Sequence, residues 1–316
     1  MADRVEAVQA APLVAVALPG ARPRRRLGYH LRRVPPVVWV CGAVLAFMCL
    51  AALFAPLVAP KDPFEQSLIR RLAPPIWSGD EVQPAQAGYL LGTDEFGRDI
   101  LSRMLYGARI SLAVGIIGVL IGAVIGSLLG MLAGYFSGAT DEIIMLLADM
   151  QLAFPFILLA IAIIAVLGPD PSGAIPWKLI VIVGISGWMT YARVCRGIVL
   201  TIKEREFVQS VRALGGTDGR IIFRHILPNI LSPIVVLATL DLARLIILES
   251  TLSFLGLGVQ PPSPSWGGML GQGRQYLDTA WWLSTFPGMA IMLTTLAISR
   301  GGDWVRDVLD PTLRSG

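Results

Sequence analysis

Four ionisable residues lie inside long apolar runs of this 316-residue sequence, which makes them the first candidates for chemistry. They are Asp149, Asp241, Arg244 and Glu249. An ionisable group in the middle of a membrane costs about 2.5 to 3.5 kcal/mol on insertion scales, so each one requires a partner or a wet cavity. Such residues either line a pathway for a solute or hold helices together.

Asp241 and Arg244 are three positions apart, which is close enough on a helix for an ion pair on one face. Glu249 lies about 140 degrees around that helix from Arg244. We therefore expect a local ion pair between Asp241 and Arg244, and we expect Glu249 to face another helix or a solute pathway.

Asp149 is followed by Gln151 and Pro155, a pattern that predicts a kinked span with polar groups inside. We take Asp149, Gln151 and Glu249 as candidate pathway residues. The alternative for all three is that they hold helices together without contacting a solute.

The sequence offers few residues that could support enzymatic catalysis. His30 and His225 lie at the edges of apolar runs and form no metal-binding or acid–base cluster with the acidic residues of those runs. The chain has no Gly-Lys pair and therefore no phosphate-binding loop of the type GxxxxGK followed by Ser or Thr. Cys41, Cys49 and Cys195 have no metal or disulfide spacing. We predict no catalytic residue, no metal site and no cofactor in this chain.

The composition is that of a membrane protein. Hydrophobic residues make up 54% of the chain, charged residues make up 15%, and the mean hydropathy is +0.67, whereas a soluble domain has about 25% charged residues. A helical span needs about 20 apolar residues to cross a bilayer core of about 30 Å. Runs of this length occupy residues 36–58, 110–136, 143–168, 178–200, 230–258 and 280–299. We therefore predict an all-α membrane protein with six transmembrane helices.

The charges on either side of these runs predict the orientation. Six arginines precede the first run and place the N-terminus in the cytoplasm by the positive-inside rule: Arg22, Arg24, Arg25, Arg26, Arg32 and Arg33. Six crossings return the C-terminus to the cytoplasm. The first run is longer than a signal-peptide core of about 7 to 15 residues, so we expect an uncleaved anchor.

The predicted organisation has five parts. They are a basic cytoplasmic tail (1–35), the first transmembrane helix (36–58), an extracytoplasmic loop (59–107), a core of five transmembrane helices (108–303) and a cytoplasmic C-terminal tail (304–316). In the extracytoplasmic loop, a turn at residues 92–97 leads into an amphipathic helix that runs towards the second span. The second extracytoplasmic loop, 259–279, has three prolines and four glycines. Its backbone cannot lie in lipid, so it lies in water or dips back into the protein, where it lines a cavity.

Glycines recur every four residues in the second span, at Gly118, Gly122, Gly126, Gly130 and Gly134. Small residues at this spacing let two helix backbones approach closely within a membrane. We expect this glycine face to pack against another helix. A pore-lining face is the alternative.

A polar and basic stretch, REFVQSVRALGGTDGRIIFRHILPN, separates the fourth and fifth spans at residues 205–229. We expect a short helix over 206–214 that ends at the Gly215-Gly216 pair. Asp218 is placed to cap a second helix that runs to Leu227, and Pro228 stands at the entry of the fifth span. The product is an elbow of two short helices.

The first helix of this elbow has Phe207, Val208, Val211 and Leu214 on one predicted side. The cytosol does not favour a bare apolar face of this kind, so we expect a protein partner to cover it.

The elbow resembles the cytoplasmic signature loop of ABC-transporter permease subunits. In that loop an EAA triplet is followed three residues later by Gly and then by a closing Leu-Pro. Gly215, Leu227 and Pro228 match this pattern, whereas the triplet in this chain is Gln209-Ser210-Val211.

Other stretches extend the resemblance over about residues 36–316. LGTDEFGRD at 91–99, GMLAGYFSG at 130–138, AFPFILLAIAI at 153–163 and SFLGLGVQPPSPSWGGML at 253–270 are similar to the C-type permease subunit of dipeptide, oligopeptide and nickel importers. At the C-terminus the chain departs from the family, with ISRGGDWVRD where an NLLGDGLRD-like run is common.

The resemblance implies a type I ABC importer permease with a MetI-like core in the bacterial inner membrane. It implies a second homologous permease subunit, two cytoplasmic ATPase subunits that bind ATP and Mg, and an extracytoplasmic substrate-binding protein. Short peptides are the expected cargo, with nickel chelates or another small solute as alternatives. By position, the ATPase-coupling residues are Glu206, Phe207, Val208, Gln209, Ser210, Val211, Arg212, Ala213, Leu214 and Gly215.

A self-contained ion-coupled carrier is the competing class of function. Such a carrier is expected to have an inverted repeat, with broken helices at matched positions of its two halves. The sequence has no such internal symmetry, and we favour the permease.

Overall fold

The computed structural model describes residues 35–79, 84–168, 170 and 176–309. Residues 36–316 form one compact unit. Within the described residues the structure is helical, with one isolated β-bridge between Thr93 and Asp99. The predicted basic tail over 1–34 and the last part of the predicted C-terminal tail, 310–316, lie outside the described residues.

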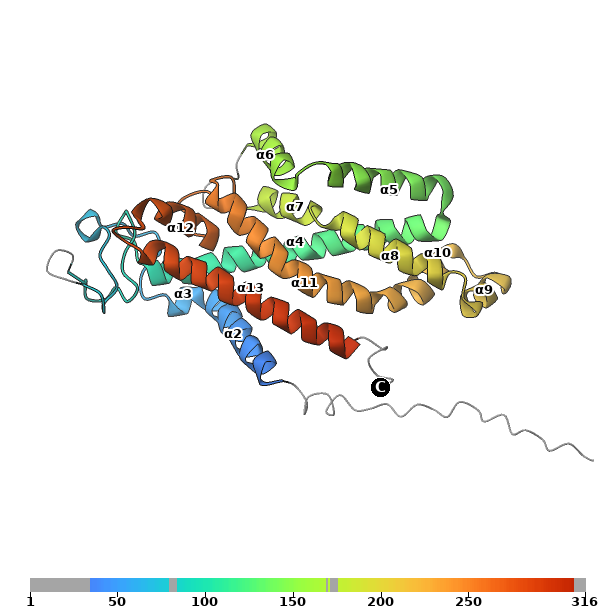
Figure 1. Ribbon diagram of the computed structural model, residues 1–316, viewed down its shortest axis with the longest axis horizontal. Helices are drawn as coiled ribbons and strands as arrows, with labels where there is room; N and C mark the ends of the chain where they lie inside the picture. Colours follow the sequence, from blue (N-terminus) through green and yellow to red (C-terminus); the bar gives the residue numbers. More distant parts are fainter. Residues whose placement is uncertain (1–34, 80–83, 169, 171–175, 310–316) are drawn as a thin grey trace, which may run out of the picture. The chain divides into compact units, whose positions relative to one another are not determined.

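Helices of membrane length dominate the arrangement (Figure 1). They are α2 (Pro36–Leu53), α4 (Ile100–Phe136), α7 (Trp177–Ile185) continued by α8 (Trp188–Ile202), α11 (Leu227–Phe254) and α13 (Trp282–Leu309). Two further helices, α5 (Gly138–Ala153) and α6 (Phe156–Leu167), form a pair that is bent by 93°. By length and composition the described residues contain five candidate spans, or six if the bent pair counts as one.

Short helices connect these elements. They are α3 (Ala55–Val58), η1 (Leu68–Arg70), α9 (Glu206–Ala213), α10 (Asp218–Arg220), the π-helical η2 (Ile221–Ile226), α12 (Trp266–Gly273) and η3 (Arg274–Tyr276).

The predicted amphipathic helix and the second span are one continuous helix, α4, which begins at Ile100 rather than at residue 110. Gly92 and Gly97 have φ angles of 83° and 73° and form the turns that precede it. The Asp99 carboxylate accepts a hydrogen bond of 2.8 Å from the Ser102 backbone N–H and caps the first turn.

The predicted third span, 143–168, is wrong as one helix because it breaks between α5 and α6. Proline disfavours the α conformation of the residue before it, and Phe154 accordingly has φ −98° and ψ 132° ahead of Pro155. The sequence predicted a kinked span, and the structure has two helices bent by 93° at this point.

The second helix of the predicted elbow does not end at Leu227. α10, η2 and α11 form one membrane-length helix from Asp218 to Phe254. Pro228 lies within this continuous helix, just after the π-helical η2, where the regular α-helical hydrogen-bond pattern is already altered. The N-cap position belongs to Thr217, so the predicted capping role of Asp218 is wrong.

The glycine face of α4 packs against α7 and α8. A Cβ atom added to Gly122 would lie 2.9 Å from the Gly184 carbonyl oxygen, and one added to Gly126 or Gly130 would overlap the backbone of α8. All five glycines of the repeat are buried. The packing prediction is confirmed and the pore-lining alternative is wrong.

The loop predicted over 259–279 dips back into the protein as α12. Trp266 is 1% exposed, and its indole N–H donates to the Met104 carbonyl oxygen at 3.1 Å. A Cβ atom on Gly267 would overlap the backbone of Ser250 in α11. The loop therefore packs between α4, α11 and α13.

Candidate functional site

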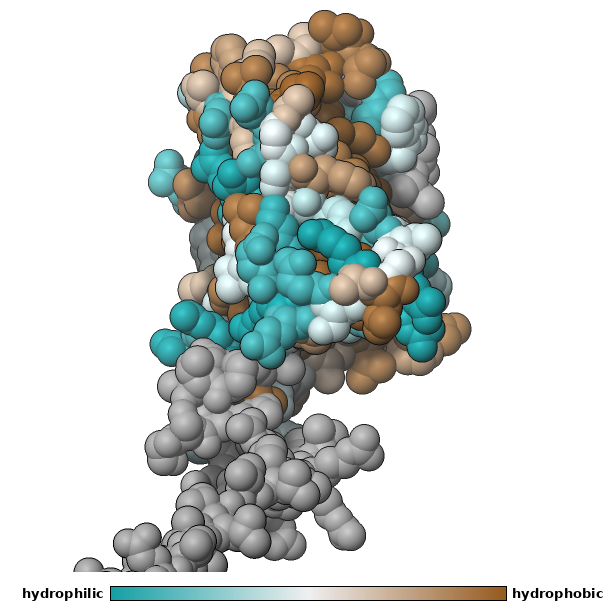
Figure 2. Space-filling model, turned by 90° about the vertical axis from the view of Figure 1, so that its right-hand side faces the viewer, coloured by the Kyte–Doolittle hydropathy of each residue, from teal (hydrophilic) through white to brown (hydrophobic). Residues whose placement is uncertain are grey.

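The elbow, defined here as residues 203–218, lies at one end of the helical bundle, opposite the end that carries α12 (Figure 1). Figure 2 looks onto the elbow end and shows a mainly hydrophilic surface in the middle, with hydrophobic residues towards its margins. This surface contains the residues for which the sequence predicts an ATPase contact.

The apolar residues of α9 do not share one free face, contrary to the sequence prediction. Val208 is fully buried, and Val211 packs against the same cluster, which includes Ile221. Phe207 and Leu214 point outward and are 41% and 87% exposed. α9 ends at Ala213, so Leu214 lies beyond the helix and its direction is set by the turn that follows. The outward-facing apolar surface of the elbow, which we call its outer face, therefore consists of Phe207 and Leu214 and is smaller than predicted.

Polar residues of α9 lie beside this outer face. The exposed polar residues are Glu206, Ser210 and Arg212, and the small apolar Ala213 is exposed beside them. Gln209 is half-buried, because its amide donates to the Lys203 carbonyl oxygen at 3.0 Å and anchors the helix to the end of α8.

Gly215 ends α9 as predicted. Its φ of +79° belongs to the left-handed region that favours glycine. The Gly215 N–H donates to the Arg212 carbonyl at 3.0 Å, and the Gly216 N–H donates to the Val211 carbonyl at 2.9 Å. These two bonds close the helix end and turn the chain towards α10.

Asp149 and Gln151 connect α5 to the α7–α8 span. Asp149 forms an ion pair with Arg193 of α8, and both side chains are largely exposed. The Gln151 amide donates to the Ile185 carbonyl at 3.0 Å and accepts from the Trp188 indole N–H. Gln151 therefore bridges the interruption between α7 and α8. In this structure both candidate pathway residues bind another helix.

Glu249 faces other helices, which is one of the two predicted alternatives for this residue. The residue is 0% exposed. Its carboxyl group accepts from the Ser253 hydroxyl at 2.7 Å and from the Ser250 hydroxyl at 3.4 Å. The hydroxyls of Ser111 in α4 and Ser265 before α12 lie near the same carboxyl. Four hydroxyl groups, from three parts of the chain, thus converge on one buried carboxyl.

Three of these serines also accept hydrogen bonds from backbone N–H groups between residues 259 and 268. Ser253 accepts from the N–H of Val259, Ser111 from that of Trp266, and Ser265 from that of Gly268. Each hydroxyl can therefore accept from the backbone while it donates to Glu249. Glu249 is a central acceptor that orders the loop between α11 and α12.

Asp241 and Arg244 form the predicted local ion pair, with the Arg244 Nε atom 2.6 Å from the Asp241 Oδ1 atom. The Tyr191 hydroxyl donates to the same carboxylate at 3.2 Å and connects the pair to α8.

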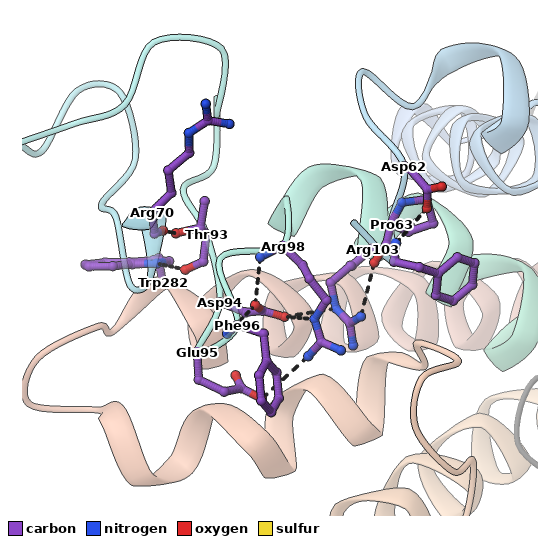
Figure 3. A network of polar contacts seen from close by, with 11 residues as sticks. Asp62, Pro63, Arg70, Thr93, Asp94, Glu95, Phe96, Arg98, Arg103 and Trp282 are labelled. Carbon is purple, nitrogen blue, oxygen red and sulfur yellow. Dashed lines mark hydrogen bonds and ion pairs between the residues drawn. The ribbon is translucent and has the colours of Figure 1, made fainter. Parts of the chain in front are cut away.

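An ionic cluster that sequence reasoning missed lies around the start of α4 (Figure 3). Asp94 Oδ2 lies 2.6 Å from Arg98 Nε and 3.4 Å from Arg103 Nε, and Arg98 Nη2 lies 3.5 Å from Glu95. Burial of the Glu95 side chain raises the pKa of its carboxyl group, and the neighbouring Asp94 raises it further. In the sequence, the only sign of this cluster is that acidic and basic residues stand close together in DEFGRD at 94–99, with Arg103 shortly after.

The cluster fastens the loop between α3 and α4 to the helical core. Arg103 donates to the Pro63 carbonyl oxygen at 3.3 Å, and the Trp282 indole N–H donates to the Thr93 carbonyl at 3.2 Å (Figure 3). Among the described residues, no group of three or more His, Cys, Asp and Glu side chains could hold a metal ion.

Comparison with known proteins gives consistent matches. Residues 126–315 match the family model described as binding-protein-dependent transport system inner membrane component. Residues 35–75 match the model described as the N-terminal TM domain of oligopeptide transport permease C.

Relatives of known name cover most of the chain. It is 45% identical over 274 residues to the di/tripeptide transport system permease protein DppC of Pseudomonas aeruginosa (strain UCBPP-PA14), covering 86% of this chain and 88% of that protein. It is 44% identical over 276 residues to the dipeptide transport system permease protein DppC of Escherichia coli (strain K12), covering 87% of this chain and 89% of that protein.

A solved structure shares the fold. A chain of the MetNI methionine ABC transporter, in an inward-facing conformation from the CY5 native crystal form, superposes with a TM-score of 0.51 at 22% identity. The match covers 66% of this chain and 96% of that chain. At this identity the likeness concerns the fold alone.

Proposed function

The chain belongs to the family of binding-protein-dependent transport system inner membrane components, and from that premise we propose that it carries short peptides. It is a multi-pass membrane permease of the ABC importer class and a transport component rather than an enzyme. The observation that carries the cargo proposal is the 45% identity, over 86% of the chain, to a permease named for di- and tripeptides.

The partners proposed for this permease are a second homologous permease subunit, two cytoplasmic ATPase subunits and an extracytoplasmic substrate-binding protein. The chain and the second permease subunit each form half of the translocation pathway. ATP-driven closure of the ATPases moves the elbow and rocks the helices, so that the pathway opens alternately to each side of the membrane.

The ATPase contact is the outer face of α9 and the turn that follows it. Phe207 and Leu214 support this assignment, because both are large apolar side chains exposed at a helix end, 41% and 87% respectively. An apolar surface of this kind is favoured at an interface with another protein. The inward-facing Val208 fixes the helix to the core and would transmit force instead of contacting the partner.

Substitution of Leu214 by aspartate tests the ATPase contact. Because Leu214 is 87% exposed, Leu214→Asp should leave the fold intact and abolish co-purification of the ATPase subunits. Leu68→Asp is the matched control, since Leu68 is 74% exposed in η1 at the other end of the bundle. Full ATPase recovery with Leu214→Asp would contradict the assignment of the elbow.

The orientation proposed here, with both termini in the cytoplasm, has its own test. Starting from a chain without its three native cysteines, a membrane-impermeant thiol reagent should label Ser78→Cys in intact cells. It should label Thr217→Cys only after permeabilisation. The opposite pattern would refute the orientation.

A further inference from the structure

Tyr135 lies in the last turn of α4 and is contacted by two parts of the elbow. Its hydroxyl donates to the Oδ1 atom of Asp218, the first residue of α10, at 2.6 Å. The guanidinium carbon of Arg212, from the last turn of α9, lies 5.6 Å from the centroid of the tyrosine ring. The ring is 7% exposed and belongs to the same buried cluster as Val208.

Lys203, at the other end of the elbow, is bound to the same turn of α4. Its ammonium group donates to the Gly134 carbonyl oxygen at 2.9 Å and to the Ser137 hydroxyl at 2.7 Å. Carbonyl groups in the last turn of a helix lack partners within the helix and carry its negative dipole end, so a lysine is well placed there. Both ends of the elbow are therefore fastened to α4.

This attachment matters because the chain itself connects the elbow to other helices. The elbow follows α8 directly and continues without interruption into α11. α4 is not next to the elbow along the chain, and its glycine face packs against α7 and α8. A force applied to α9 reaches α4 either through the packing of α8 on this glycine face or directly through the contacts of Tyr135 and Lys203.

The turn between α9 and α10 makes such a fastening necessary. Gly215 and Gly216 lie between the two helices, and glycine resists backbone rotation less than any other residue. Without a cross-link, α9 could pivot at this turn while α4 stayed in place. Asp218 lies beyond the turn and Arg212 lies before it, so contacts with Tyr135 hold both sides of the turn against α4.

We propose that Tyr135 is a positioning residue that couples the elbow to α4, so that movement of the elbow by the ATPases shifts α4 together with α8 and α11. The inference rests on the proposed function of the elbow as the ATPase contact. The hydrogen bond to Asp218 carries most of the coupling, because a bond to a carboxylate is stronger than one between neutral groups. Coupling energies between distant sites typically correspond to about 5-fold to 150-fold effects.

The test uses the complete transporter in proteoliposomes, with the amount of solute imported per ATP hydrolysed as the readout. Tyr135→Phe removes only the hydroxyl group and should lower this ratio by about fivefold or more, while assembly and basal ATP hydrolysis stay unchanged. Asp218→Ala should have the same effect. Asp218→Asn keeps an acceptor oxygen but removes its charge, so its ratio should fall between those of wild type and Asp218→Ala.

Two further variants complete the design. The double variant Tyr135→Phe with Asp218→Ala should lose no more than either single variant, because both changes remove the same bond. Tyr276→Phe is the control for loss of a tyrosine hydroxyl, in η3 at the opposite end of the bundle, and should leave the ratio unchanged.

An unchanged ratio in Tyr135→Phe, or a double-variant loss equal to the product of the single losses, would overturn the inference. A wild-type complex without ATP-dependent uptake would contradict the proposed function and the inference together. Wild-type uptake with an unchanged Tyr135→Phe ratio would contradict the inference alone.

Discussion

Glu249 is the buried residue whose replacement should destabilise the chain most specifically. Glu249→Ala removes the single acceptor on which the hydroxyls of Ser111, Ser250, Ser253 and Ser265 converge. No cation is paired with Glu249 in the described part of the chain, so the substitution exposes no opposite charge. The substitution therefore lowers stability through the lost hydrogen bonds and through the cavity that the smaller side chain leaves.

The size of this loss follows from the number of contacts. A hydrogen bond contributes about 0.5–1.5 kcal/mol net, so the two bonds from Ser250 and Ser253 to Glu249 amount to about 1–3 kcal/mol. The larger cost of a fully unpaired buried hydroxyl, about 1–3 kcal/mol each, does not apply in full to Ser253, which keeps the Val259 N–H as a second partner. We therefore expect Glu249→Ala to lower the free energy of unfolding by about 1–3 kcal/mol.

Equilibrium unfolding of the purified subunit in mixed micelles, by titration with a denaturing detergent, measures this change. Glu142→Ala is the control, because Glu142 is an exposed glutamate of α5. Ser253→Ala combined with Glu249→Ala should cost less than the sum of the two single changes, since the two groups share a bond. A Glu249→Ala protein within about 0.5 kcal/mol of wild type would refute the role assigned to this carboxyl.

Two other substitutions test the packing and the outer cluster. Gly126→Ala should prevent stable folding, because its Cβ would overlap the Trp188 backbone. Loss of monodisperse protein in detergent measures this effect. Gly197→Ala is the control and should be tolerated, because a Cβ at Gly197 would have no atom within 4 Å. Because burial raises the pKa of Glu95 above its ordinary 4.5, the folded state favours its protonated form and loses stability as pH rises above that value. Glu95→Gln should remove this loss, so that wild type and variant differ less in unfolding free energy at about pH 5 than at about pH 8.

Apolar run length predicted the existence of the spans, whereas local backbone rules decided where they break. Pro155 was visible in the sequence, but the consequence of its steric demand on Phe154, a bend of 93°, depends on what packs around the two helix ends. Pro228 had a different outcome, since the helix continues through it from Asp218 to Phe254, with the π-helical η2 just before it. The sequence predicted a kink at Pro155 and a helix boundary at Pro228, whereas the structure has a sharp bend at the first position and a continuous helix at the second.

Side-chain direction was the least predictable property of the candidate site. A short helix with apolar residues on one predicted side does not reveal that Val208 turns inward while Leu214, beyond the helix end, turns outward. The Asp218 partner of Tyr135 lies 83 positions away in the sequence, so no local pattern could pair the two residues. The glycine face of α4 was predictable, because its regular spacing has a direct physical meaning in a membrane.

Peptide uptake into proteoliposomes is the measurement that tests the central claim most directly. The chain is reconstituted with its permease partner and ATPases, the binding protein is added outside, and ATP is enclosed. A labelled dipeptide should accumulate only when both ATP and the binding protein are present, and an unlabelled tripeptide should compete while a nickel chelate should not. Accumulation of the nickel chelate in place of the peptide, or peptide uptake that needs neither ATP nor the binding protein, would contradict the assignment of this chain as a short-peptide permease of an ATP-driven importer.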